Sequence, residues 1–346
     1  MRASRAAPRT TRSLARLSDA ELLKIRLCDL PVSLSRSPVS RAIARLGREL
    51  RGRGINFKPH VWLAEEWFSP DGVPGFAVPF YLTHPRLMRM ERAMMGQVEG
   101  GNSNWLMRIL RHEAGHAIDN AYRLRRQREW REVFGPASLP YPNRYRARPG
   151  SRRYVHHLGD WYAQAHPTED FAETFGVWLQ PHSAWRRHYA DWPAMHKLTL
   201  VQRLMDKLGD QPPVVTRREV VEPLTTNKRT LADHYRRRAL QHIHHRRGRI
   251  DELLHRVFCV RPRRADAATA MHLLTSERKK LVRHVMRDCG VDRYTACQIL
   301  RMVVDRARPA RLYQRGSRRE NLRNLRWMLA SITHDFLRTQ SPTLPL

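Results

Sequence analysis

The chain has 346 residues and a formal net charge of +32 at neutral pH, because 64 Lys and Arg outnumber 32 Asp and Glu. This length suggests about two domains. No apolar run approaches the roughly 18 residues of a membrane span, so integral membrane association is not expected. The four cysteines form no C-x-x-C pair, which argues against a disulfide framework or a cysteine zinc site and favours a cytoplasmic location.

The first 18 residues carry five Arg and no acidic residue, yet they lack the apolar core of a secretory signal. We therefore predict a basic, disordered tail over 1–18, with a transit peptide as the alternative. Ser18 followed by Glu21 resembles a capping box, so a helix is expected to start there.

Gly75 to Leu82 form a short apolar run that predicts a β-strand. Pro79 inside the run indicates an edge or bulged position, and an exposed edge can accept a peptide as an extra strand. Phe76, Val78 and Phe80 are therefore the predicted substrate-binding residues. The alternative is a buried edge strand that only packs on a helix.

Residues 112–116 spell H-E-x-x-H, the most informative motif of the chain. On a helix this spacing places His112 and His116 on one face, where both can bind one Zn²⁺, while Glu113 can take a proton from water. Asn102 to Asn104 offer helix caps, and no Pro or Gly interrupts 105–111. Gly115 is compatible with another element crossing close to the helix. The alternative is an amphipathic helix with two surface histidines.

A catalytic zinc normally has three protein ligands and one open position. Asp119 and Tyr122 stand where the long H-E-x-x-H-x-x-G-x-x-H motif needs Gly and His, so that class is excluded. Downstream, 167–175 reads as a helix start, with Pro167 and Thr168 as entry and cap. Glu169 and Glu173 would share one helix face, so one carboxylate can bind metal while the other accepts a hydrogen bond from a ligand histidine. The alternative is a pair of solvated glutamates.

The remaining elements are mainly helical. Residues 136–150 are rich in Pro, Tyr and Arg and predict a long surface loop that lines or covers a cleft. Helical patterning returns over 186–210, and Gln211-Pro212-Pro213 predicts a domain boundary. Further helices are predicted near 229–258, 268–289, 294–307 and 318–338.

Positive charge is spread along the chain and is denser after residue 216, where 30 Lys and Arg accompany 12 Asp and Glu. This charge makes nonspecific nucleic-acid binding or an acidic protein substrate plausible, although no nucleic-acid motif accompanies it. Five histidines gather near the basic segment: His234, His242, His244, His245 and His255. We interpret them as part of a solvated basic helix, because a metal there would be repelled by the neighbouring Arg side chains.

HEAGHAIDN (112–120) followed by WYAQAHPTEDFAETFGVWL (161–179) resembles the bacterial zinc-binding metallopeptidases of the gluzincin type, and is more remotely similar to the catalytic domain of anthrax lethal factor. Upstream, 65–68 and 79–85 also look like the bacterial family. The resemblance implies that Glu169 is the third zinc ligand, that Glu173 holds a ligand histidine in place, and that Tyr162 stabilises the tetrahedral intermediate. Beyond about residue 215 the resemblance thins.

These observations predict a mainly helical α+β protein. A zincin-like metallopeptidase domain with a small edge-strand sheet would span 19–211, and a basic helical domain would span 214–346. One Zn²⁺ on His112, His116 and Glu169 would serve peptide hydrolysis, with Glu113 as general base and Tyr162 at the oxyanion. Asp119 is a further candidate to support the site, or an ordinary helical Asp paired with Arg. The alternative function is a basic nucleic-acid-binding protein on a catalytically inactive zincin-like scaffold.

Overall fold

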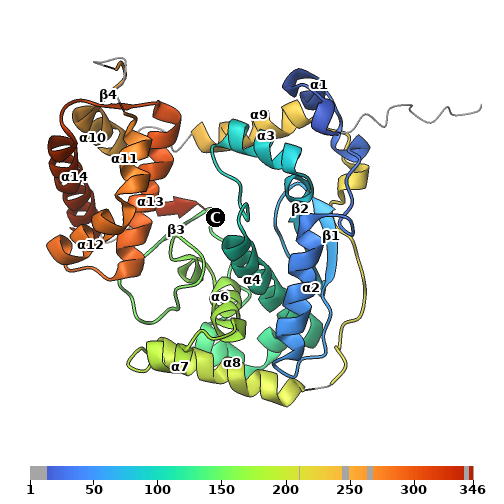
Figure 1. Ribbon diagram of the computed structural model, residues 1–346. Coiled ribbons are helices and arrows are strands. Elements are labelled where there is room, and N and C mark those ends of the chain that lie inside the picture. The colour runs from blue at the N-terminus through green and yellow to red at the C-terminus, as the bar shows by residue number, and fades with distance from the viewer. Residues whose placement is uncertain (1–13, 210, 244–248, 263–267, 339–342, 346) are drawn as a thin grey trace, which may run out of the picture.

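The computed structural model of the chain describes residues 14–209, 211–243, 249–262, 268–338 and 343–345 (Figure 1). Helices account for most of these residues and the strands are short, which agrees with the predicted mainly helical α+β class. No described helix is long and apolar enough to cross a membrane. Of the predicted basic tail, residues 1–13 lie outside the described residues, and Leu14 is buried in a short 3-10 helix.

Helices of the first part of the chain surround a central pair, α4 and α6. The α-helices of this first part are α1 (Asp19–Leu23), α2 (Pro38–Arg51), α3 (Pro85–Met95), α4 (Ser103–Tyr122), α5 (Arg128–Phe134), α6 (Pro167–Leu179), α7 (Trp185–His188), α8 (Ala194–Leu208) and α9 (Leu231–Ile243). Short 3-10 helices cover Leu14–Arg16, Leu27–Asp29, Phe80–Thr83, Leu124–Arg126, Tyr162–Gln164 and Leu224–Thr226. Figure 1 shows α4 and α6 between the helices α2 and α8 and the C-terminal group of helices.

The C-terminal group consists of five helices: α10 (Arg249–Val257), α11 (Ala270–Ser276), α12 (Arg278–Cys289), α13 (Arg293–Ala310) and α14 (Arg318–Arg338). The helices α13 and α14 match the predicted segments 294–307 and 318–338 to within a few residues, because each has an apolar stripe of regular spacing. The segment predicted over 268–289 is helical but is divided between α11 and α12. The segment predicted near 229–258 is divided between α9 and α10.

The described strands form three small two-stranded sheets. In the first, β1 (His60–Ala64) pairs in parallel with β2 (Gly75–Pro79), in the register His60 to Gly75. In the second, β3 (Arg144–Arg146) pairs antiparallel with β6 (Thr343–Pro345), and in the third, β4 (Phe258–Cys259) pairs antiparallel with β5 (Tyr313–Gln314). The strand predicted over 75–82 is therefore confirmed for its first five residues, and a 3-10 helix follows.

Two large hydrophobic cores divide most of the described chain, and a small third cluster contains Trp62, Ala64, Val73 and Ala77. The first collects apolar side chains from Leu14 to Tyr235, including the facing sides of α2, α4, α6 and α8. The second is made by α10 to α14 together with Tyr145, Ala147, Trp161 and Ala165 from the segment between α5 and α6. Because Leu231 and Tyr235 lie in the first core, α9 packs with the first part of the chain, although the predicted boundary at 211–213 would assign it to the second.

The histidines of the basic segment do not share one environment. His234 on α9 is buried with 1% of its surface exposed, and its Nδ1 lies 3.1 Å from Glu65 Oε2. The interpretation of a solvated helix is therefore wrong for His234, because this face of α9 packs on the first core. His244 and His245 lie outside the described residues.

Candidate metal centre

Helix α4 carries the H-E-x-x-H motif as predicted. Its N-terminus is capped by Asn102, whose side-chain oxygen accepts a hydrogen bond from the backbone N–H of Trp105 at 3.0 Å. All residues from Met107 to Tyr122 except Arg108 are buried, so the motif lies inside the protein. The alternative of two surface histidines is excluded, since His112 and His116 are 3% and 8% exposed.

Helix α6 brings the acidic pair to the same place. The helix is entered through Pro167, but the cap is His166 and not the predicted Thr168. The His166 ring donates from Nε2 to the carbonyl of Leu139 at 2.9 Å, which leaves Nδ1 free to accept from the Thr168 N–H at 3.3 Å. Glu169 and Glu173 are both buried, so they are not a solvated pair.

A small residue lets the two helices meet closely. A Cβ added at Gly115 would lie 2.9 Å from Ala172 Cα and 3.3 Å from the Ala172 carbonyl oxygen, on the backbone of α6. Only Gly allows this approach without displacing a helix. The close crossing expected from Gly115 is therefore confirmed, and it sets the distance between the two halves of the site.

Three side-chain atoms converge at this crossing. Glu169 Oε2 lies 3.0 Å from His112 Nε2 and 3.2 Å from His116 Nε2, and the two nitrogens are 3.1 Å apart. In a tetrahedral zinc site with bonds of about 2.0–2.1 Å, the ligand atoms are about 3.3 Å from one another. Nitrogen and carboxylate oxygen donors in this triangle therefore fit a single zinc ion, and the group can hold a metal.

Glu173 orients His112 within this triangle. Its Oε1 lies 3.0 Å from His112 Nδ1, and its Oε2 accepts a hydrogen bond from the backbone N–H of Leu158 at 2.9 Å. A proton held on Nδ1 by the carboxylate leaves the lone pair of Nε2 directed at the centre of the triangle.

Electrostatics within the cluster favour opposite charges on its members. Burial alone would lower the pKa of His112, but hydrogen bonds and charge from Glu169 and Glu173 raise it well above its usual value. Burial would likewise raise the pKa of Glu169, yet the two histidines hold it well below its usual value. The cluster thus stabilises an ionised carboxylate beside positive charge, which is what a divalent cation would also supply.

Glu113 is buried next to the triangle and its Oε2 has no hydrogen-bond partner among the described residues. Burial raises the pKa of its carboxyl above the usual value, the histidine charges oppose that shift and the charge of Glu169 adds to it. An unpartnered buried carboxylate is costly unless a ligand or substrate uses it. Glu113 therefore has the environment of a base held ready for a proton.

Two tyrosines approach the cluster, one predicted and one not. The ring of Tyr162 lies 5.6 Å from that of His112, and burial together with the charge of Glu169 raises the pKa of its phenol well above the usual value. Tyr141 was missed by the sequence analysis: its hydroxyl donates to Glu169 Oε1 at 2.9 Å, and its ring stacks on His166 at 4.0 Å. The only sequence signal was its position between Pro140 and Pro142 in the loop expected to cover a cleft.

Asp119 does not join this group. Its carboxylate accepts hydrogen bonds from the backbone N–H and the Nε of Arg125, at 2.8 Å and 2.5 Å. Arg125 also reaches Asp71, so the three residues form an ion-pair network at the end of α4. The structure places Asp119 in its alternative role, an Asp paired with a nearby Arg.

The predicted substrate-binding side chains also lie elsewhere. Phe76, Val78 and Phe80 have no exposed surface and pack in the first core. The strand β2 has β1 on one side, and the N–H of Ala77 donates to the Phe68 carbonyl at 2.8 Å on the other. The prediction that these side chains contact a peptide is wrong, because β2 is the buried strand of the alternative interpretation.

Comparison with known proteins agrees with this geometry. Residues 95–190, which contain α4, α5 and α6, match the model of the family described as "Putative zinc-binding metallo-peptidase". No curated protein and no solved structure is detectably similar to the chain. The similarity to the lethal factor domain is not shown, whereas the resemblance to zinc-binding metallopeptidases is confirmed for the matched segment.

Proposed function

We propose that the chain is a zinc-dependent peptidase of the gluzincin type, in which His112, His116 and Glu169 hold one Zn²⁺. The observation that carries this proposal is the convergence of their three ligand atoms, at 3.0–3.2 Å from one another, beside a buried carboxylate on the same helix. The match of 95–190 to a family of zinc-binding metallopeptidases supports a peptide or protein as the substrate.

The residues of the chain then divide the chemistry among them. A bound zinc would supply Lewis acidity toward water and toward the peptide carbonyl. Glu113 would take a proton from the attacking water as its oxygen bonds to the carbonyl carbon, and would pass that proton to the amine as the C–N bond breaks. Burial raises the pKa of Glu113, so its carboxylate takes up a proton more readily than an exposed glutamate would.

The oxyanion formed in this step needs a hydrogen-bond donor. The raised pKa of Tyr162 keeps its phenol protonated at neutral pH, so it can donate to the developing negative charge. Tyr141 already donates to the Glu169 oxygen that faces away from the histidines, and would hold that carboxylate with one oxygen toward the metal.

The Glu113→Gln variant tests the assignment. It keeps the size of the side chain but removes the base, so hydrolysis of a pool of random-sequence fluorogenic peptides should fall about 100- to 10,000-fold while zinc content is unchanged. Glu49→Gln is the matched control, because Glu49 on α2 is a buried carboxylate that pairs with Arg111 of α4, the helix that carries Glu113. Hydrolysis that survives Glu113→Gln would contradict the mechanism.

Nonspecific nucleic-acid binding remains a second proposal, because exposed basic residues recur every four positions before an exposed aromatic residue on α14. Trp327 is 55% exposed, and Arg319 and Arg323 on the same helix are also exposed. Basic residues beside an aromatic ring are typical of surfaces that bind single strands. Affinity for an oligonucleotide should then fall steeply with salt and should not change in Glu113→Gln.

A further inference from the structure

Helix α13 of the C-terminal group has two distinct faces. Ala296, Ile299 and Val303 point into the second core and have no exposed surface. On the other face, polar residues recur at positions that share one helical stripe. These are Tyr294, Gln298, Arg301, Asp305 and Arg308.

This polar stripe contacts the segment that precedes α6. The Tyr294 hydroxyl donates to the Leu158 carbonyl at 2.7 Å and accepts from the Trp161 N–H at 3.2 Å. Gln298 Oε1 accepts from the Asp160 N–H at 3.1 Å, and Arg301 forms an ion pair with the Asp160 carboxylate. Tyr294 and Gln298 thus bond three backbone groups of one short loop, and Arg301 pairs with a side chain of the same loop.

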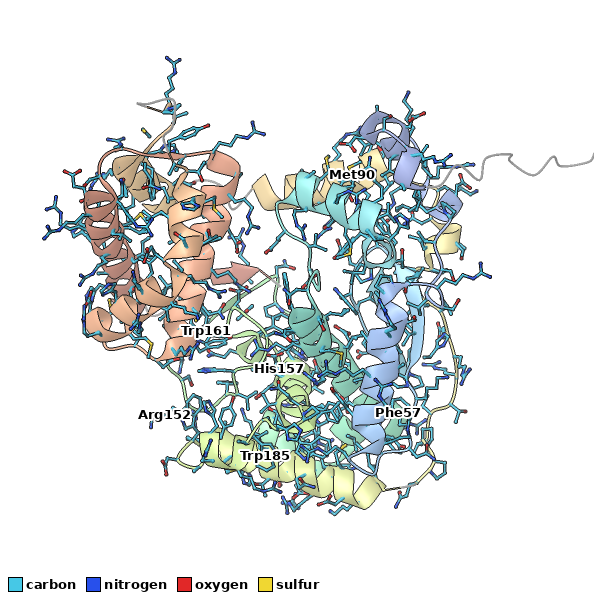
Figure 2. The ribbon with its side chains drawn as sticks, in the orientation of Figure 1. Phe57, Met90, Arg152, His157, Trp161 and Trp185 are labelled. Carbon is cyan, nitrogen blue, oxygen red and sulfur yellow. The ribbon has the colours of Figure 1, made fainter. Side chains whose placement is uncertain are left out.

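The loop needs such support because its backbone is strained. Asp160 and Trp161 have φ values of 58° and 55°, so two consecutive non-glycine residues adopt the left-handed conformation. Each costs on the order of 1–3 kcal/mol and persists only where its surroundings impose it. Trp161, which is labelled in Figure 2, is 1% exposed and packs in the second core. Its ring lies 5.1 Å from that of Phe336.

The Arg301 guanidinium lies directly on the loop. A Cβ at Gly159 would be 2.2 Å from Arg301 Nη1, so the guanidinium occupies the space next to Gly159 that a side chain would otherwise fill. At the far end of the stripe, Arg308 Nη1 donates to the Gly96 carbonyl at 2.6 Å, in the connection between α3 and α4. The helix therefore touches the segments that lead into both α4 and α6.

The same loop ends at the metal centre. The Leu158 N–H donates to Glu173, which in turn holds His112 Nδ1, and Tyr162 directly follows the strained Trp161. A change in the conformation of 158–161 would therefore move both the partner of a ligand histidine and the proposed oxyanion donor.

We propose that α13 is the positioning element of the metal centre, with Tyr294, Gln298 and Arg301 holding the 158–161 loop in the conformation that orients Glu173, His112 and Tyr162. This role rests on the proposed zinc site and gives the C-terminal helices a part in its function. It also explains why the strained loop lies against a helix of the second core and not in solvent.

The test measures zinc affinity in the full-length protein, by competition with a chromophoric chelator, for Tyr294→Phe and Arg301→Met. Tyr294→Phe removes only the hydroxyl and keeps the ring that stacks on His156 at 3.9 Å, so folding should be retained. Arg306→Met is the matched control, because Arg306 also lies on α13 and pairs with an Asp, but the partner is Asp251 within the C-terminal group. The visible spectrum of the Co²⁺-substituted protein reports ligand geometry in each variant.

Both test variants should lose about tenfold in zinc affinity and change the Co²⁺ spectrum, since residues that support metal ligands typically contribute 10- to 100-fold. Arg306→Met should lower the melting temperature without either effect. Wild-type affinity and spectrum in both test variants, with melting temperatures lowered as in the control, would reduce α13 to a structural role. A folded wild-type protein that binds no zinc would instead overturn the proposed function itself.

Discussion

The two hydrophobic cores differ in what they bury besides apolar side chains. The first encloses ionisable groups that interact with one another, among them Glu113, Glu169, Asp170 and Glu173. The second is closed over apolar residues, and its described buried polar residues are mostly neutral, such as Thr295, Asn321 and Thr333. Buried charge lowers stability unless it is paired. The first core therefore retains ionisable groups that packing does not explain, whereas the second encloses mainly apolar side chains.

This contrast predicts a difference in acid sensitivity. His157 is buried between α4 and α6, and its Nε2 donates to the Arg108 carbonyl at 2.9 Å (Figure 2). Burial lowers the pKa of His157 from 6.5 to about 4. Above pH 6.5 both folded and unfolded states hold the ring neutral. Below it only the unfolded state gains a proton, so stability falls as the pH drops from 6.5 to 4.

The loss attributable to His157 should be on the order of 3 kcal/mol across that window, and urea unfolding at several pH values measures it. His157→Gln keeps a donor for the Arg108 carbonyl but cannot titrate, so its stability should fall less on acidification. His272→Gln in α11 is the control from the second region, where this histidine is exposed. A loss of stability between pH 6.5 and 4 that is as large in His157→Gln as in the wild type would contradict the prediction.

A second prediction concerns the carboxylates of the two regions. Glu173→Gln replaces the acceptor on His112 Nδ1 and should lower zinc affinity about 10- to 100-fold, because the ligand histidine loses its fixed orientation. Glu277→Gln is the matched change in the second region, since Glu277 is also buried but lies at the start of α12 and pairs with Arg318. Chelator competition should show wild-type affinity in that control. Equal affinities for the two variants would remove Glu173 from the site.

The smallest expected effect comes from glycines. Gly115→Ala places a methyl group 2.9 Å from the backbone of α6, so the helices must separate at a cost of about 1–3 kcal/mol, and zinc affinity should fall with stability. Gly290→Ala is strained for a different reason, a left-handed φ of 65° with open space around it, and should cost about 1–2 kcal/mol with no change in zinc affinity. Unfolding titrations and zinc titrations of both variants distinguish an effect of the distance between α4 and α6 from a general loss of stability.

The features that the sequence predicts correctly depend on the spacing of residues within one helix. The helices α13 and α14, which have a regular apolar stripe, are predicted to within a few residues, because their apolar faces pack in the second core. The motif on α4 and the acidic pair on α6 were also found, because metal ligation requires fixed spacing within one helix. Both signals are local in the chain.

The remaining features depend on contacts between distant segments. Tyr141 reaches Glu169 from a loop with no regular pattern, and Asp160 adopts a left-handed backbone because α13 holds it. The burial of Phe76 and the packing of α9 on the first core are likewise decided by which elements meet. Local spacing carries no information on such pairings, so a cleft wall was predicted where a buried strand lies.

The most direct test of the central claim is the zinc content of the purified full-length protein, measured beside His116→Ala and Glu169→Ala, with His284→Ala as a control outside the site. The convergence of the three ligand atoms predicts about one zinc per chain in the wild type and the control, and a sharp loss in both site variants. Zinc retained in both site variants, or no zinc in a folded wild-type protein supplied with the metal, would contradict the proposed site.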